Sequence, residues 1–147
     1  TPMAVIIDAA RYGAHAREVA HAFQVRLIED AALPPHGAVS FPVGRIVVCA
    51  PIIDDTTYAV ALHEIGHVVA PRGSLSGSCR PEGFRHELRL TVVEEDAAWT
   101  WAHHYALEWT PLMDHVERWG RASYHEALDR LNAAVVQARQ PRVTPND

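Results

Sequence analysis

The feature that most constrains the fold of this chain is the stretch His63-Glu64-Ile65-Gly66-His67, which has the form HExxH. Two histidines four positions apart project from one face of an α-helix, one turn from each other. Imidazoles placed in this way can both bind a single Zn²⁺ at about 2.0–2.1 Å. Glu64 is offset by one position, so its carboxylate can hold and deprotonate a water molecule beside the metal. The stretch therefore predicts a helix that carries two zinc ligands and a general base.

The residues around the motif support a helix that reaches about Ala70, where Pro71 ends it. Residues 54–56 offer side chains for its N-cap. Gly66 costs roughly 1 kcal/mol of helix stability relative to alanine, so we expect another backbone segment to pack closely against it. Apolar residues recur at helical spacing and define the face expected in the core, away from the two histidines: Tyr58, Leu62, Ile65 and Val69.

The alternative is that two of the 10 histidines fall four positions apart by chance. In a chain of this composition, chance alone produces the three specified residues about one time in twenty. A chance match has no reason to lie in the middle of a helix, beside a core face and with a glycine between the histidines. The zinc interpretation is therefore favoured.

A catalytic zinc site needs a third protein ligand and an open position for water. The extended pattern HExxHxxGxxH is excluded, because Ala70 and Gly73 stand where it requires glycine and histidine. The remaining source is a glutamate on a second helix. Glu95 is the preferred candidate, since its helix face is largely apolar and a carboxylate there needs a cation. Glu94 is the alternative ligand, because its helix face is only slightly less apolar. A further possibility is that Glu94 and Glu95 are both solvated acids on the protein surface.

The order of the apolar segments predicts an α+β fold with a small antiparallel sheet of about three strands and several packed helices. Strands are expected at 25–29, 38–41 and 45–50, the last two forming an antiparallel hairpin. Helices are expected over 9–25, 54–70 and 85–109, in a short segment that opens at Thr110-Pro111, and over 123–139, where Ser123 has capping-box spacing. A loop is expected over 72–84. We expect a single domain over residues 1–140 and a flexible tail at 141–147.

Composition excludes several classes of function. A net charge of −5 argues against direct binding of nucleic acid, which needs a surplus of basic side chains. No apolar run is long enough to span a bilayer, and no secretion signal opens the chain. Cys49 and Cys79 do not form a disulfide framework, and a reducing cytoplasm is the expected location. The four tryptophans are expected in packing between helices rather than in a substrate groove.

Two segments resemble the ImmA/IrrE family of zinc metallopeptidases. The strand at 45–48, a short loop and then residues 61–67, ALHEIGH, are similar to the family's strand, loop and "aHElgH" helix. Residues 95–102, EDAAWTWA, are similar to its "ExxAxxFA" helix, with Trp101 in place of the phenylalanine and Trp99 in place of the usual asparagine or aspartate. The resemblance covers roughly residues 25–106. It implies a zincin-like domain with one Zn²⁺ bound by His63, His67 and Glu95.

The resemblance further implies hydrolysis of a peptide bond in a protein or peptide substrate, with Glu64 as the general base. Such sites usually have one more donor for the oxyanion. His103, about two turns beyond Glu95, is the preferred candidate among His86, Arg89, His103, His104 and Tyr105. Two other functions remain open: a non-catalytic zinc module of the same fold that binds a partner, and a hydrolase of another amide or ester.

Overall fold

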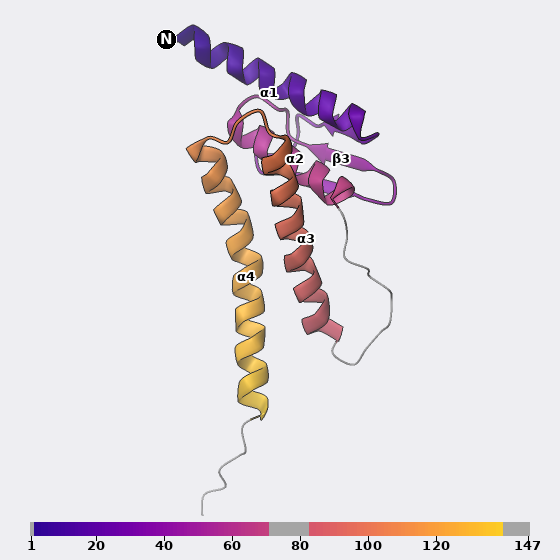
Figure 1. Ribbon diagram of the computed structural model, residues 1–147, viewed down its shortest axis with the longest axis vertical. Coiled ribbons are helices and arrows are strands. Elements are labelled where there is room, and N and C mark those ends of the chain that lie inside the picture. The colour runs from indigo at the N-terminus through magenta and orange to yellow at the C-terminus, as the bar shows by residue number, and fades with distance from the viewer. Residues whose placement is uncertain (1, 71–82, 140–147) are drawn as a thin grey trace, which may run out of the picture.

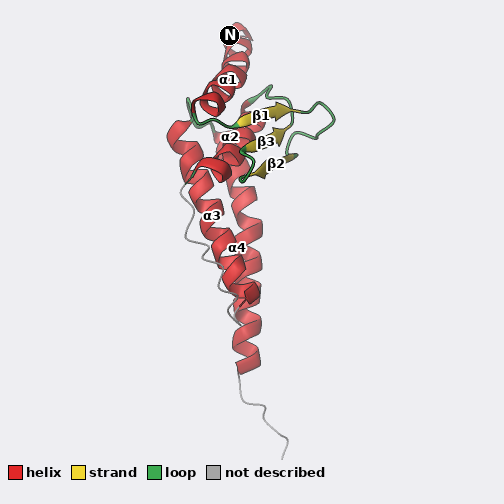
Figure 2. Cartoon of the chain, turned by 90° about the vertical axis from the view of Figure 1, so that its right-hand side faces the viewer, coloured by secondary structure: helices red, strands yellow, loops and turns green. Residues whose placement is uncertain are grey.

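The computed structural model describes residues 2–70 and 83–139, so most of the expected loop and the whole of the expected tail lie outside the described residues. The described part is α+β, as the sequence predicts. It contains seven elements: α1 (Pro2–Ala22), β1 (Arg26–Glu29), β2 (Ala38–Phe41), β3 (Ile46–Cys49), α2 (Asp55–Val69), α3 (Gly83–Tyr105) and α4 (Pro111–Arg139). The helices α3 and α4 run side by side away from the end where α1, the sheet and α2 lie (Figures 1 and 2). None of the described helices has the length and apolar character needed to cross a membrane.

The sheet is mixed, and the prediction of an antiparallel sheet is wrong for one of its strands. Its order is β1-β3-β2. The hairpin of β2 and β3 is antiparallel as expected, with Val39 opposite Val48. The strand β1 runs parallel to β3, with Leu27 opposite Val47. The hairpin thus occupies one edge of β3, and β1 pairs at the other edge.

The first helix ends three residues before the position expected from the sequence. Gln24 has a φ of 58°, in the left-handed region, and the N–H of Val25 donates to the carbonyl of Ala20 at 2.8 Å. This arrangement closes the C-terminus of a helix and usually uses glycine at the left-handed position. Because glutamine stands there, the sequence carries no signal for this end. The helix also begins at Pro2 rather than at residue 9.

The last helix is continuous, and the prediction of two separate helices after residue 109 is wrong. Thr110 caps it as expected, since its hydroxyl accepts from the N–H of Met113 at 3.2 Å. Ser123 does not open a new helix, because its hydroxyl donates to the carbonyl of Gly120 at 3.0 Å within α4. A Cβ on Gly120 would lie 3.1 Å from the indole of Trp99. The glycine therefore allows α4 to approach α3 and does not end the helix.

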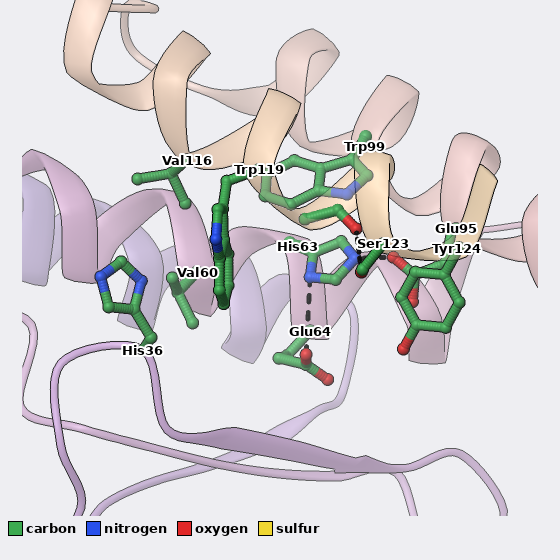
Figure 3. Close-up of a pocket in the computed structure, with 11 residues that line it drawn as sticks. His36, Val60, His63, Glu64, Glu95, Trp99, Val116, Trp119, Ser123 and Tyr124 are labelled. Atoms are coloured by element: carbon green, nitrogen blue, oxygen red, sulfur yellow. Dashed lines mark hydrogen bonds and ion pairs between the residues drawn. The ribbon is translucent and has the colours of Figure 1, made fainter. Parts of the chain in front are cut away.

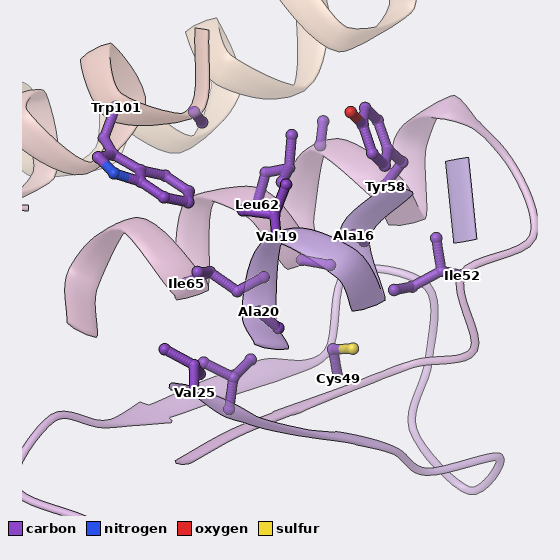
Figure 4. Close-up of a cluster of buried hydrophobic side chains, with 14 of the residues drawn as sticks. Ala16, Val19, Ala20, Val25, Cys49, Ile52, Tyr58, Leu62, Ile65 and Trp101 are labelled. Atoms are coloured by element: carbon purple, nitrogen blue, oxygen red, sulfur yellow. The ribbon is translucent and has the colours of Figure 1, made fainter. Parts of the chain in front are cut away.

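The hydrophobic core lies where α1, the sheet and α2 meet, with Trp101 of α3 against it (Figure 4). Three of the four residues expected on the core face of α2 are fully buried, namely Tyr58, Leu62 and Ile65. Burial of side chains of this size stabilises a fold by roughly 1.5–3 kcal/mol each. The hydroxyl of Tyr58 also accepts from the N–H of Leu107 at 3.0 Å, which ties α2 to the connection between α3 and α4. The core thus fixes α2 by one face and leaves another face for the histidines.

Candidate metal centre

The helix that carries the histidines begins at a complete capping box. The carboxylate of Asp54 accepts from the N–H of Thr57 at 2.8 Å, and the hydroxyl of Thr57 accepts from the N–H of Asp54 at 3.1 Å. The sequence predicts a cap within residues 54–56, and the structure places it at Asp54. A cap of this kind contributes about 1 kcal/mol to helix stability.

A contact between main chains brings the second helix against α2. A Cβ on Gly66 would lie 2.6 Å from the carbonyl oxygen of Ala98 and 3.1 Å from its Cα, closer than real Cβ atoms come to a backbone oxygen. Only glycine fits without a shift of one helix, which confirms the expectation that Gly66 marks a close approach of another backbone segment. The contact lies beside Glu95, one turn before Ala98 on α3. It sets the distance at which Glu95 faces the histidines.

Three donor groups converge between the two helices. The Nε2 atoms of His63 and His67 lie 3.0 Å apart. That of His63 lies 2.7 Å from Oε2 of Glu95, and that of His67 lies 2.7 Å from Oε1 of the same carboxylate. Glu95 is buried, with 6% of the residue exposed. Ligand atoms at about 2.0–2.2 Å around a tetrahedral zinc lie roughly 3.3 Å from one another. Two imidazole nitrogens and one carboxylate oxygen are a donor set that zinc prefers, and they are gathered here to within roughly half an ångström of that spacing.

Glu64 lies beside this group and contacts it differently. Its Oε1 atom lies 3.5 Å from Nδ1 of His63, the ring nitrogen that faces away from Glu95. One ligand atom each from His63, Glu64 and His67 also fall within 4.8 Å of one another, so Glu64 is a second possible carboxylate donor. Glu95 differs from Glu64 in that its two oxygens contact both Nε2 atoms directly. Glu64 lines the cavity beside them.

Glu94 is not brought to the histidines. One of its carboxylate oxygens, Oε1, is buried and has no hydrogen-bond partner. The structure thus separates the two candidates for the third ligand. Glu95 lies on the face of α3 that is turned toward the two histidines of α2, and Glu94 does not contact them.

The ionisation of the group follows from its contacts. Burial lowers the pKa of His63, but hydrogen bonds with Glu64 and Glu95, together with their charges, outweigh it and raise the pKa to about 9. Burial raises the pKa of Glu95, but hydrogen bonds with His63 and His67 outweigh it and lower the pKa to about 2. Without metal, the site therefore holds an ion pair of imidazolium and carboxylate near neutral pH. A metal ion that bound Nε2 of His63 would have to displace a proton from this imidazolium.

The metal-free protein should show this ion pair in the pH dependence of its stability. The raised pKa of His63 stabilises the fold fully below pH 6.5, and this contribution is lost as pH rises through about 9. The lowered pKa of Glu95 stabilises it fully above pH 4.5, with loss as pH falls through about 2. In excess chelator, urea unfolding should give a free energy of unfolding that falls by roughly 2–3 kcal/mol between pH 6 and pH 10. Glu95→Gln should show a smaller fall, and an equal fall in both proteins would contradict the assignment.

Trp99 was expected in ordinary packing, and the structure gives it a contact with a candidate ligand. Its indole is stacked on the imidazole of His63, with ring centroids 4.0 Å apart and an angle of 13° between the rings. Trp99 follows Glu95 by four residues, so both project from the same face of α3. The stack fixes the orientation of the imidazole plane. The spacing from Glu95 was the signal in the sequence that could have revealed this role.

The group opens into a cavity of about 290 Å³ (Figure 3). Its wall combines the candidate site with residues from the turn before β2 and from α4. The lining residues are His36, Val60, His63, Glu64, Glu95, Trp99, Val116, Trp119, Gly120, Ser123 and Tyr124. Trp119 is 67% exposed, and its ring centroid lies 5.6 Å from that of His36. An exposed tryptophan at a cavity is typical of a binding surface.

The preferred oxyanion donor of the sequence analysis does not lie on this cavity. Nε2 of His103 lies 2.5 Å from the buried carboxylate of Glu117, and its ring lies 3.7 Å from that of Trp109 between centroids. Glu117 in turn accepts from Arg121 at 3.0 Å. His103 thus belongs to a polar network between α3 and α4, and its catalytic role stays a prediction without a contact that supports it. His104 and Tyr105 do not line the cavity either, and the side chains of residues 83–90 lie outside the described part.

The cavity residues contributed by other elements were missed by sequence reasoning. The sequence predicts no role for His36, places Trp119 in packing between helices, and puts Tyr124 in the first turn of a separate helix over 123–139. Their positions depend on how α4 and the turn lie against α2, for which no local pattern exists. The chain matches no family model, no curated protein and no solved structure. Its function is therefore inferred from the site itself.

Proposed function

We propose that the chain is a zinc-dependent peptidase with a zincin-like fold, in line with its resemblance to the ImmA/IrrE family. The observation that carries this proposal is the convergence of His63, His67 and Glu95 at 2.7–3.0 Å, with a further carboxylate, that of Glu64, beside them on a cavity. In this proposal His63, His67 and Glu95 hold one Zn²⁺. A structural zinc site rarely keeps a carboxylate and a cavity next to it, because it is closed by four protein ligands.

The residues of the chain supply the proton transfers. Zinc, when bound, would polarise the substrate carbonyl and lower the pKa of the attacking water to about 7. Glu64 takes a proton from the water as the water oxygen bonds to the carbonyl carbon. The bond between carbon and nitrogen then breaks, and Glu64 returns the proton to the leaving amine. The products are a carboxylic acid and an amine, which become a carboxylate and an ammonium when the remaining water proton moves to the amine, and Glu64 is regenerated.

Two features beside the site support a peptide as the substrate. The strand β2 pairs with β3 on one side, and no other described strand pairs with its free edge. An open edge can bind an extended peptide through main-chain hydrogen bonds. His36, two residues before β2, lines the cavity. Trp119, Val60 and Val116 give the cavity an apolar wall that suits an apolar side chain next to the cleaved bond.

Metal removal tests the proposal. The purified protein should contain one equivalent of zinc and cleave members of a quenched fluorescent peptide library. Dialysis against a chelator should abolish cleavage, and one equivalent of zinc should restore it, because both the carbonyl and the water depend on the ion.

Other results would support different functions. Bound zinc without cleavage of any peptide would indicate a binding module, whereas cleavage of simple esters or amides alone would indicate a different hydrolase. Cleavage that survives complete removal of zinc would refute the proposal.

A further inference from the structure

We propose that Tyr124 is a catalytic residue whose hydroxyl donates a hydrogen bond to the oxyanion that forms when the substrate carbonyl is attacked. This proposal rests on the proposed peptidase function and deepens it. It gives α4 a catalytic residue, which lies outside the HExxH motif of α2.

The position of Tyr124 carries the proposal. The residue lies on α4, opposite the helices that bear the candidate ligands and base, and it lines the same cavity as Glu64 and Glu95. In Figure 3 its ring lies beside Glu95, and its hydroxyl points to the side of the cavity where Glu64 lies. A donor there faces the space that a substrate carbonyl must enter to be attacked by water held at Glu64. The side chain is 36% exposed, so it is accessible to a substrate.

The hydroxyl of Tyr124 is not used to hold the fold together. Within the described residues it makes no hydrogen bond, whereas the hydroxyl of Tyr58 contacts His15 at 2.7 Å and that of Tyr12 donates to Glu108. Tyrosine hydroxyls with structural roles in this chain are thus paired. Among the described residues the hydroxyls of Tyr105 and Tyr124 have no hydrogen bond, and of these two residues Tyr124 lines the cavity.

The surroundings of Tyr124 keep it in the form that donates. Burial raises the pKa of its hydroxyl, and the negative charges of Glu95 and Glu64 raise it further. The phenol therefore remains protonated at neutral pH.

Other polar groups near the site are already occupied. Ser123 also lines the cavity, but its hydroxyl donates to the carbonyl of Gly120 at 3.0 Å. His103 is held at 2.5 Å from Glu117, away from the cavity lining. The two histidines of the motif are engaged with Glu95.

His36 and Trp119 line the cavity too, but in Figure 3 His36 lies beside Val60, at the end of the cavity away from Glu95. The ring nitrogen of Trp99 is buried. Tyr124 is the hydroxyl donor that lies beside Glu95 without a hydrogen-bond partner among the described residues.

The step that it assists is balanced by the residues described above. As the water oxygen bonds to the carbonyl carbon, one electron pair of the C=O bond moves onto the carbonyl oxygen, and the water proton passes to Glu64. Tyr124 donates to the oxygen that gains this charge and keeps its own proton. When the bond between carbon and nitrogen breaks, the charge returns into a carbonyl bond and the hydrogen bond weakens. Stabilisation that appears only in the transition state raises kcat and leaves KM nearly unchanged.

Tyr124→Phe and a matched control, Tyr105→Phe, test the role. Tyr105 is 37% exposed and does not line the cavity, so the same hydroxyl is removed at equal exposure outside the site. With zinc content equal to wild type in both, Tyr124→Phe should lower kcat by roughly 10²–10³-fold and change KM by less than about threefold. Tyr105→Phe should match wild type. Calorimetry with a phosphonamidate peptide, which mimics the tetrahedral oxyanion, should show affinity for Tyr124→Phe reduced by a similar factor, with unchanged affinity for the product peptides.

The outcomes separate this proposal from the peptidase proposal. Equal kcat and equal phosphonamidate affinity in both phenylalanine variants would overturn the role of Tyr124, while zinc-dependent cleavage by wild type would still support the peptidase. An effect on KM alone would also overturn it, since that result indicates a contact made equally with bound substrate. Absence of cleavage by zinc-loaded wild type would refute the peptidase and this role together.

Discussion

Replacing Glu64 by glutamine is expected to lower the rate of peptide hydrolysis by roughly 10²–10⁴-fold while the protein keeps its zinc. Glutamine has nearly the same shape, but its amide cannot take the proton of the attacking water. The ligand contacts of His63 and His67 are with Glu95, so they do not depend on the removed charge. The measurement is kcat/KM on a cleaved peptide, with zinc determined on the same sample.

The melting temperature and the zinc content of Glu64→Gln are the controls for this prediction. Oε1 of Glu64 lies 3.5 Å from Nδ1 of His63, and this contact matters most while His63 carries a proton. Bound zinc would displace that proton, so the melting temperature of the zinc-loaded protein should be nearly unchanged. A Glu64→Gln protein that is folded, contains zinc and cleaves at the rate of wild type would show that another group acts as the base. If Glu64→Gln instead loses zinc, Glu64 is itself a zinc ligand.

The second large effect is expected on metal affinity, from Glu95→Gln. Structural zinc sites with four ligands bind with about 10–16 kcal/mol, so one ligand contributes roughly 3 kcal/mol, or about a hundredfold in affinity. Removal of the charge of Glu95 should therefore weaken zinc binding by at least about a hundredfold and abolish cleavage at stoichiometric zinc. Competition with a chromophoric chelator measures the affinity.

The neighbouring glutamate provides the matched control. Glu94→Gln makes the same change one position along α3, where the carboxylate has a buried oxygen without a hydrogen-bond partner. We expect it to bind zinc as wild type does. The opposite pattern, in which Glu94→Gln loses zinc and Glu95→Gln retains it, would reverse the assignment of the third ligand.

Much of this site could be predicted because it depends on the geometry of single helices. His63, Glu64 and His67 lie within one and a half turns, so the backbone fixes their relative positions once the segment is helical. The choice of Glu95 used the largely apolar face of its helix, and Ala98, one turn further along the same helix, is the residue that contacts Gly66.

The parts that could not be predicted depend on packing between elements. The parallel pairing of β1 depends on the edge at which it joins the hairpin and on its direction there, and nothing in the strand itself encodes either. Ser123 has the residues of a helix cap, yet its hydroxyl is satisfied inside a continuous helix. Tyr124 was for this reason assigned to a helix start, when its place in the middle of α4 is what directs it into the cavity.

The contact of Gly66 with Ala98 bears on which cation the site can select. At this point α2 and α3 are in contact through main-chain atoms, so the two helices cannot come closer together. Moving them apart would open the core beside Ile65, which is fully buried. The donors are thus held close together. Zinc needs ligands at 2.0–2.2 Å, whereas Ca²⁺ takes six to eight oxygens at 2.3–2.6 Å. We therefore expect that Gly66, which does not contact the metal, makes the site prefer zinc over larger ions. Gly66→Ala should reduce this preference. Competition between zinc and the larger cadmium ion would measure the change.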